Sequence, residues 1–187
     1  SVISSLTNDN SATPTELAKY YYWIAEIYWA KGGEYLTDKK CILTNLLRSA
    51  KYDASSSPVF ASLGRYYEYS NDLDRAKRCY QKSLLLDPYN ELSGQRISEI
   101  FVNEGNEAEA VKVYHKILQN QTGVECATWA WRKMANYYLK NHKYSEALNC
   151  FQSVLRAEPD DGEALLGLEA SYKQQGMYIA ALRVLER

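Results

Sequence analysis

The chain has few residues that break regular structure, with 9 glycines and 4 prolines among 187 residues. No uninterrupted apolar stretch approaches the length of about 18 residues that a membrane helix needs, and residues 1–10 are neither basic nor apolar enough for a signal peptide. Scarce breakers favour long helices over a fold of strands and turns. We therefore expect an ordered, helical protein that is neither embedded in a membrane nor secreted.

The chain also lacks an excess of either charge. It carries 22 Lys and Arg against 23 Asp and Glu, and the balance holds from segment to segment. Proteins that bind phosphate backbones concentrate positive charge on one face. No direct binding of nucleic acid is expected.

Cysteine and histidine do not occur at the spacings of a metal site or a catalytic centre. No C-x-x-C pair is present, no histidine lies at ligand spacing, and neither histidine is near a candidate nucleophile. Four cysteines are too few for a disulfide scaffold, which indicates reduced thiols in the cytoplasm or nucleus. We expect no enzyme activity, no metal and no cofactor. The residues concerned are Cys41, Cys79, Cys126, Cys150, His115 and His142.

A 34-residue pattern recurs along the chain, and its frame is clearest from Ser57. Large residues stand at positions 4, 7 and 11, small ones at 8 and 20, an aromatic at 24 and a proline at 32. These residues are Phe60, Leu63, Tyr67, Gly64, Ala76, Tyr80 and Pro88. The pattern resembles the tetratricopeptide (TPR) repeat.

Four further frames follow the same pattern. The frame from Thr128 is regular, the frame from Glu91 is degenerate with Gly94 at position 4, and the frame from Ala18 has an enlarged loop near residues 31–38. The predicted repeats are 18–56, 57–90, 91–127, 128–161 and a truncated 162–187, preceded by a linker or loop over 1–13. The resemblance implies an all-α solenoid of antiparallel helix pairs stacked in a right-handed superhelix.

The physical basis of the pattern is packing between the two helices of each pair, A and B. Positions 4, 7 and 11 form one stripe of helix A, and small residues at 8 and 20 allow a close approach. Breakers near Asn71, Gly105, His142 and Gly176 mark the turns between A and B. The frame assigns nine of the 17 tyrosines to packing: Tyr21, Tyr28, Tyr67, Tyr80, Tyr114, Tyr138, Tyr144, Tyr172 and Tyr178.

Both ends of the array carry distinct signals. Thr13 to Glu16 has the form of a capping box with proline at the first helical position, so a helix is expected to begin there. At the other end, Leu182 and Leu185 would lack a following repeat, and solenoids normally end with a polar cap. We expect both ends to be internal to a longer protein.

A sharper resemblance rests on unusual features in a fixed order. They are a long loop in the first repeat, a degenerate third repeat containing Ser93-Gly94 and a doubled tryptophan that opens the fourth. The matching segments are Tyr28-Trp29, a helix start at Asp38-Lys39, Leu63 to Tyr67, Arg75-Ala76, Cys79-Tyr80, Trp129 to Trp131, Tyr137 to Lys140 and Leu155 to Asp160. Over roughly residues 18–187 the chain resembles the TPR scaffold subunits of superkiller complexes.

This resemblance implies a role in protein assembly. Such subunits are not catalytic and hold an RNA helicase and β-propeller subunits, supporting 3′-to-5′ mRNA decay by the cytoplasmic exosome. The segment would belong to the inner part of the array. Two alternatives stay open, which are a co-chaperone module that binds peptide tails and the TPR arm of a larger enzyme.

Candidate contact residues lie on helix A, at the positions that face the concave side of a TPR array. Arg132 and Asn136 are one turn apart and, with Lys140, could grip a carboxylate as chaperone-binding domains do. A full clamp would also need an Asn where Gly167 stands. The predicted set is Tyr22, Trp29, Arg65, Tyr69, Trp129, Arg132, Asn136 and Lys140.

Overall fold

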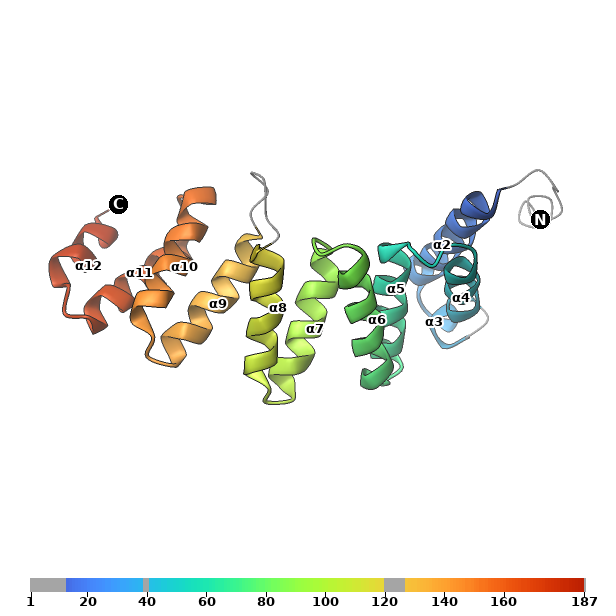
Figure 1. Cartoon of the computed structure of the whole chain (residues 1–187), viewed down its shortest axis with the longest axis horizontal. Coiled ribbons are helices and arrows are strands. Elements are labelled where there is room, and N and C mark those ends of the chain that lie inside the picture. Colours follow the sequence, from blue (N-terminus) through green and yellow to red (C-terminus); the bar gives the residue numbers. More distant parts are fainter. Residues whose placement is uncertain (1–12, 39–40, 120–126, 187) are drawn as a thin grey trace. The chain divides into compact units, whose positions relative to one another are not determined.

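The computed structural model describes residues 13–38, 41–119 and 127–186. Every regular element in these ranges is a helix, and successive helices form antiparallel pairs joined by short turns (Figure 1). The chain divides into two compact units, Ser1–Ile97 and Ser98–Arg187, which are described separately. The predicted all-α fold of helix pairs is confirmed.

The helices follow the chain in order, and each A helix is followed by its B helix. The first pair is α2 and α4, with the short α3 in its loop. The bounds are α2 Pro14–Lys31, α3 Glu34–Thr37, α4 Leu43–Tyr52, α5 Ser57–Tyr69, α6 Leu73–Leu86, α7 Glu91–Asn103, α8 Glu107–Gln119, α9 Thr128–Lys140, α10 Tyr144–Ala157, α11 Gly162–Gln174 and α12 Tyr178–Leu185. Of the predicted linker over 1–13, only Thr13 belongs to the described residues.

Helix α2 begins at the predicted capping box. The Thr13 side chain accepts a hydrogen bond from the Glu16 amide at 3.3 Å, and the Thr13 amide donates to Glu16 Oε2 at 2.8 Å. Pro14 occupies the first turn, where its missing N–H costs nothing. These reciprocal bonds satisfy two backbone donors and confirm the predicted start.

The loop of the first pair differs from expectation in one respect. Gly32 ends α2 at φ 66°, as its sequence indicates, but the loop then contains the short helix α3. The helix start that the resemblance implied at Asp38-Lys39 is wrong, since α4 begins at Leu43. Asp38 instead ends α3, and its backbone carbonyl accepts a hydrogen bond from the Cys41 amide at 3.0 Å.

The turns between A and B helices share one backbone conformation. Asn71, Gly105, His142 and Gly176 all occupy position 15 of their repeats and all have φ between 59° and 76°. After each of them, an amide bonds back to a carbonyl of the last A-helix turn, as Asp72 does to Tyr67 at 2.8 Å. This left-handed geometry closes a helix and suits Gly and Asn.

Substitution of Gly176 is expected to show what this conformation costs. Gly176→Ala should lower the free energy of unfolding by about 1 kcal/mol, because the left-handed region is unfavourable for a residue with a Cβ. No atom lies within 4 Å of that added Cβ, so the cost is conformational and not steric. Gly176→Asn should cost less, since Asn tolerates this region as Asn71 does; equal losses in chemical denaturation would contradict this account.

The core of unit 1 joins the first two pairs. The side chains of five residues are at most 3% exposed and form one cluster: Ala25 of α2, Ile42 at the N-cap of α4, Leu46 of α4, and Val59 and Leu63 of α5. Within the second pair, Gly64 faces the ring of Tyr80, and an added Cβ would lie 2.5 Å from its Cε1. The prediction that a small residue at position 8 allows a close approach of the two helices is confirmed here, and the residue that it meets is the aromatic at position 24 of the same repeat.

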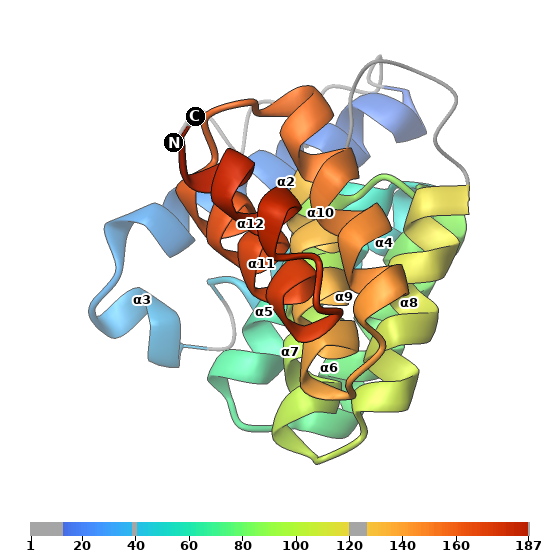
Figure 2. The same cartoon turned by 90° about the vertical axis from the view of Figure 1, so that its left-hand side faces the viewer.

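The core of unit 2 is built around Phe151, which is fully buried. Its ring lies over Gly167 of α11, where an added Cβ would be 2.5 Å from Cε1. Gly167 therefore has a packing role, which explains why no polar residue stands there. Helices α9 and α11 lie side by side in this unit (Figure 2). The buried cluster extends over α8 to α11.

The tyrosines assigned to packing are mostly, but not all, in contact with the core. Tyr80 and Tyr114 are at most 4% exposed, and Tyr138 and Tyr172 pack partly buried against the core of unit 2. The assignment of Tyr178 to packing is wrong, because its side chain is 64% exposed at the start of α12. Its position in the frame is regular, but among the described residues it belongs to neither buried cluster nor its partly buried surroundings.

Candidate protein-interaction surface

The predicted contact residues form two groups, one in each unit. Tyr22, Trp29, Arg65 and Tyr69 come from α2 and α5, and the other four come from α9. In both groups the A helices bring the residues together, because positions near 5, 9 and 12 of a helix recur on one face. Each group makes intramolecular contacts that sequence alone does not reveal.

The first group is centred on Arg65 and is called the Arg65 cluster, consisting of Tyr22, Glu26, Trp29, Ser62, Arg65 and Tyr69. Arg65 Nη2 donates to both oxygens of Glu26, at 2.9 and 2.7 Å. Its guanidinium also lies 4.3 Å from the centre of the Trp29 ring. Tyr69 meets Trp29 edge to face at 5.9 Å, and Ser62 donates to Glu26 at 2.6 Å.

These contacts fill the space between α2 and α5. The side chains of Arg65 and Glu26 are 28% and 24% exposed, so the ion pair is partly shielded from water. Burial, followed by the nearby Glu26 carboxylate, raises the pKa of Tyr22. A planar guanidinium stacked on an indole and paired with a carboxylate is specific to arginine.

Arg65→Lys should therefore lower the free energy of unfolding by about 1 kcal/mol, because lysine keeps the charge but loses the fork and the stacking. The measurement is chemical denaturation followed by circular dichroism. Arg78→Lys, at an exposed site of α6, is the matched control and should leave stability unchanged. Equal stability of the two variants would mean that the Arg65 cluster contributes nothing.

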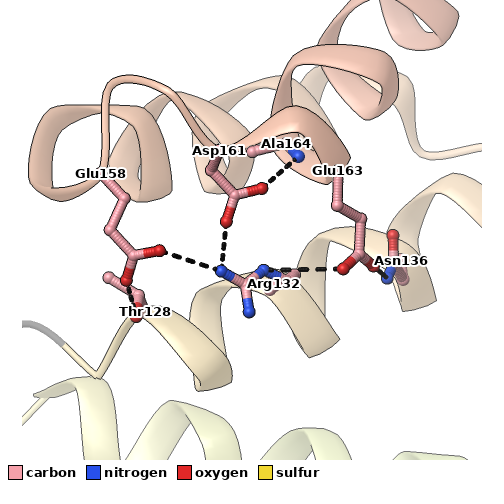
Figure 3. A network of polar contacts seen from close by, with 7 residues as sticks. All are labelled: Thr128, Arg132, Asn136, Glu158, Asp161, Glu163 and Ala164. Atoms are coloured by element: carbon pink, nitrogen blue, oxygen red, sulfur yellow. Dashed lines mark hydrogen bonds and ion pairs between the residues drawn. The ribbon is translucent and has the colours of Figure 1, made fainter.

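The second group is centred on Arg132 (Figure 3). Its guanidinium pairs with Asp161, lies 3.2 Å from a Glu158 oxygen and has Nε 3.8 Å from Glu163. Thr128 donates to Glu158 at 2.6 Å, and Asn136 donates to Glu163 at 3.0 Å. These contacts, called the Arg132 network, join α9 to the start of α11.

Asp161 has two roles in this network. It caps α11 by accepting a hydrogen bond from the Ala164 amide at 2.7 Å. Burial by itself would raise the pKa of Asp161, but the bond from Ala164 and the Arg132 guanidinium hold it below its usual value. Its side chain is 9% exposed, so these interactions are little screened.

Arg132, Asn136 and Lys140 do bind carboxylates, but they bind three different ones, all of which belong to the chain itself. Arg132 holds Asp161, Asn136 holds Glu163, and Lys140 pairs with Glu107 of α8. A peptide tail would have to displace these groups to bind. The arrangement thus argues against the co-chaperone alternative. Trp129 also makes a contact within the chain, because its ring meets the ring of Tyr114 edge to face with the ring centres 6.0 Å apart.

A groove between α7, α8 and α9 is the feature that sequence reasoning missed. It has a volume of about 440 Å³, within the range of ligand pockets. Its lining comes from Glu99, Val102 and Asn103 of α7, from α8, and from Lys133, Asn136, Tyr137 and Lys140 of α9. Only Asn136 and Lys140 belong to the predicted set. The spacing of these four α9 residues places them on one helix face, but sequence gives no sign that the space beside it is empty.

The described residues show no group of three or more His, Cys, Asp or Glu side chains able to hold a metal ion. Burial raises the pKa of the Cys150 thiol to about 12 and that of Cys79 to about 11. Both thiols are therefore protonated at neutral pH and poor nucleophiles. Cys126 lies outside the described residues. Among the residues that the structure describes, no helix is long and apolar enough to cross a membrane.

Comparison with known proteins first defines the class. Models of the tetratricopeptide repeat match residues 58–90 and 128–170. The fold is similar to a MamA protein with a TM-score of 0.67 at 15% identity, covering 91% of this chain and 89% of that one. The fold is also similar to that of YrrB, described as a TPR protein with an unusual peptide-binding site. The TM-score is 0.65 at 14% identity, covering 100% of this chain and 90% of that one. The chain therefore contains tetratricopeptide repeats and has the fold of a TPR array.

Within this class, the sequence is similar to superkiller protein 3. Human superkiller complex protein 3 is 34% identical over 170 residues, covering 90% of this chain and 11% of the human protein. Superkiller protein 3 of Schizosaccharomyces pombe is 30% identical over 173 residues, covering 90% and 12%. The resemblance seen in the sequence is confirmed. The chain spans only a small part of the length of these relatives.

Proposed function

We propose that this chain is one stretch of a longer, non-catalytic scaffold of the superkiller type. The scaffold holds an RNA helicase and β-propeller subunits and supports 3′-to-5′ mRNA decay by the cytoplasmic exosome. The observation that carries the proposal is similarity to superkiller protein 3 along nine-tenths of the chain, in an animal and in a yeast. A cytoplasmic location is part of this proposal.

The surfaces of the two units support a scaffold role. The Arg65 cluster and the Arg132 network stiffen neighbouring A helices against one another within each unit. A solenoid that holds partners at set positions needs such links, because each repeat contacts only its neighbours. The described residues offer polar and aromatic contacts for proteins but no concentrated positive field for RNA.

Affinity purification of the intact parent protein tests this proposal. The expected result is recovery of an RNA helicase, β-propeller subunits and exosome factors, identified by mass spectrometry. Nuclease treatment before purification should not release them, because the contacts are between proteins. Recovery of chaperones alone would reject the superkiller role and favour the co-chaperone alternative.

A further inference from the structure

An A helix of this chain packs antiparallel against the B helix that precedes it, and fixed repeat positions meet there. Ser93, at position 3 of α7, donates a hydrogen bond at 2.8 Å to Ser83, at position 27 of the preceding repeat. Gly167, at position 6 of α11, lies against Phe151, at position 24 of the preceding repeat. An antiparallel pair that joins 3 to 27 and 6 to 24 also brings position 10 to position 20.

Side chains in these junctions are buried and complementary in size. In unit 2 a ring at position 24, that of Phe151, covers a glycine at position 6. In unit 1 the residue at position 6 is again small, and the α5 residues at positions 3, 6 and 10 are at most 4% exposed. A preceding helix therefore covers these three positions in both units. The residues are Val59, Ser62 and Tyr66 of α5 and Ala164, Gly167 and Ser171 of α11.

The outer face of α2 differs from these junctions. Tyr20, Trp23 and Ile27 occupy positions 3, 6 and 10 of the first repeat, and their side chains are 40%, 62% and 54% exposed. These three residues are called the α2 stripe. Two of them are aromatic, at positions where α11 has alanine and glycine. Among the described residues no helix precedes α2.

The geometry of the α2 stripe suits a second helix. Its members are three and then four residues apart, which places them on one line along the helix surface. Covering two aromatic rings and an isoleucine removes a continuous apolar surface from water. Alignment with human superkiller complex protein 3 covers only 11% of that protein, so a parent of similar length contains many residues outside this chain. The occupant that we assign is a helix of the same parent.

A regular TPR B helix does not fit the α2 stripe. Such a helix carries an aromatic residue at position 24, as Tyr80, Tyr114 and Phe151 do in this chain. That ring would meet Trp23. Against Phe151 there is no room even for a Cβ, because one added at Gly167 would lie 2.5 Å from Cε1 of the ring. The helix opposite Trp23 therefore needs a small residue at this position.

We propose that the α2 stripe is covered by a helix of the same parent protein that precedes α2, runs antiparallel to it and carries Gly, Ala or Ser opposite Tyr20, Trp23 and Ile27. These small residues occupy positions 20, 24 and 27 of that helix. The order of sizes found between α10 and α11 is thus reversed, with the large residues on the A helix. The inference rests on the proposed function in one respect, which is that the chain is one stretch of a longer protein.

Photo-crosslinking in the purified parent protein identifies the occupant. Trp23 is replaced by p-benzoylphenylalanine, and the crosslinked peptides are identified by mass spectrometry after irradiation. The expected crosslink stays within one polypeptide and joins α2 to a segment before Pro14 with small residues at the stated spacing. The same amino acid at Tyr89, which is 51% exposed after α6, should not reach that segment. A crosslink to another protein, to a second copy or to a helix with large residues there would overturn the proposal, as would none.

Hydrogen exchange in α2 gives a second test. In the parent protein, Trp23→Asp should speed amide exchange in α2 by about tenfold or more, because it breaks the contact with the covering helix. In the isolated chain the same change should have little effect, since the side chain is already exposed. Tyr89→Asp is the control and should leave exchange in α2 unchanged in both. Equal effects of Trp23→Asp in the two proteins would contradict the proposal.

A rescue experiment tests the size of the facing residue. Replacing the small residue found opposite Trp23 by Leu in the parent protein should also speed exchange in α2. Adding Trp23→Ala to that variant should restore slow exchange, because the smaller side chain makes room for Leu. A double variant that exchanges as fast as the Leu variant would contradict the proposed size match.

The two proposals can fail separately. If no preceding helix covers the α2 stripe while the parent protein still recovers a helicase, the junction proposal fails and the scaffold role stands. If the covering helix is found but no superkiller factors are recovered, the reverse holds.

Discussion

Gly167→Leu is expected to lower the free energy of unfolding of unit 2 by about 2–3 kcal/mol, because a side chain there would overlap the ring of Phe151. The ring is fully buried, so it cannot move into solvent without exposing the core. Rings in close-packed interiors have little free space to give. Chemical denaturation followed by circular dichroism measures the loss.

Gly162→Ala is the matched control for this experiment. It lies at the start of the same helix, and nothing is within 4 Å of its added Cβ. Its stability should equal or slightly exceed that of the unchanged chain, since alanine favours helix over glycine. The double variant Gly167→Leu with Phe151→Leu should lose less stability than the sum of the losses of the two single variants, because the smaller side chain makes room for the new one. Additive losses would mean that the ring is not the cause.

Arg132→Gln is expected to lower the free energy of unfolding by about 2 kcal/mol at neutral pH. Three carboxylates, Glu158, Asp161 and Glu163, would then lose their shared cation. Removing one partner from a fully buried pair costs about 3–5 kcal/mol, and partial exposure of this network reduces that figure. Arg156→Gln, at an exposed site of α10, should leave stability unchanged.

The effect of Arg132→Gln should depend on pH in a defined direction. The pKa of Asp161 is held below its ordinary value of 3.8 in the folded chain, so the unfolded chain binds the proton more readily. Its contribution to stability is complete above the ordinary value and is lost as the pH falls through the folded value. The difference between the two proteins should therefore shrink below pH 3.8. A constant difference across the acid range would exclude Asp161 as the source.

Local features of the fold could be predicted because single residue types encode them. Asn71, Gly105 and Gly176 mark the turns because only such residues adopt a left-handed backbone easily, and His142 follows by its place in the frame. The capping box at Thr13 is likewise encoded within four residues. Repetition then extended these local signals to the whole helical pattern.

Contacts between repeats could not be predicted in the same way. Gly167 is explained by a ring that lies one repeat away, and the frame alone assigns no such partner to position 6. Arg132 was identified as a carboxylate-binding residue, but sequence cannot tell whether the carboxylate is external or lies 29 residues further along the chain. The groove between α7, α8 and α9 could not be predicted for the same reason. It depends on side chains of separate helices that are small or that bond to residues elsewhere.

Of the alternatives that the sequence left open, the structure bears on the co-chaperone module. The co-chaperone clamp would compete with Asp161, Glu163 and Glu107 for its basic and amide groups. The proposed superkiller role calls for a multi-subunit assembly, in which contacts along a solenoid combine through effective concentration.

Replacing residues 14–187 in the parent protein by the same number of consensus TPR repeats tests the central claim most directly. The exchange keeps the length of the array but removes the surfaces described above, and recovery of each partner is then quantified by mass spectrometry. The account predicts that at least one superkiller partner is lost, and that restoring the natural segment recovers it. Full recovery of every partner with the consensus repeats would show that this segment is only a spacer.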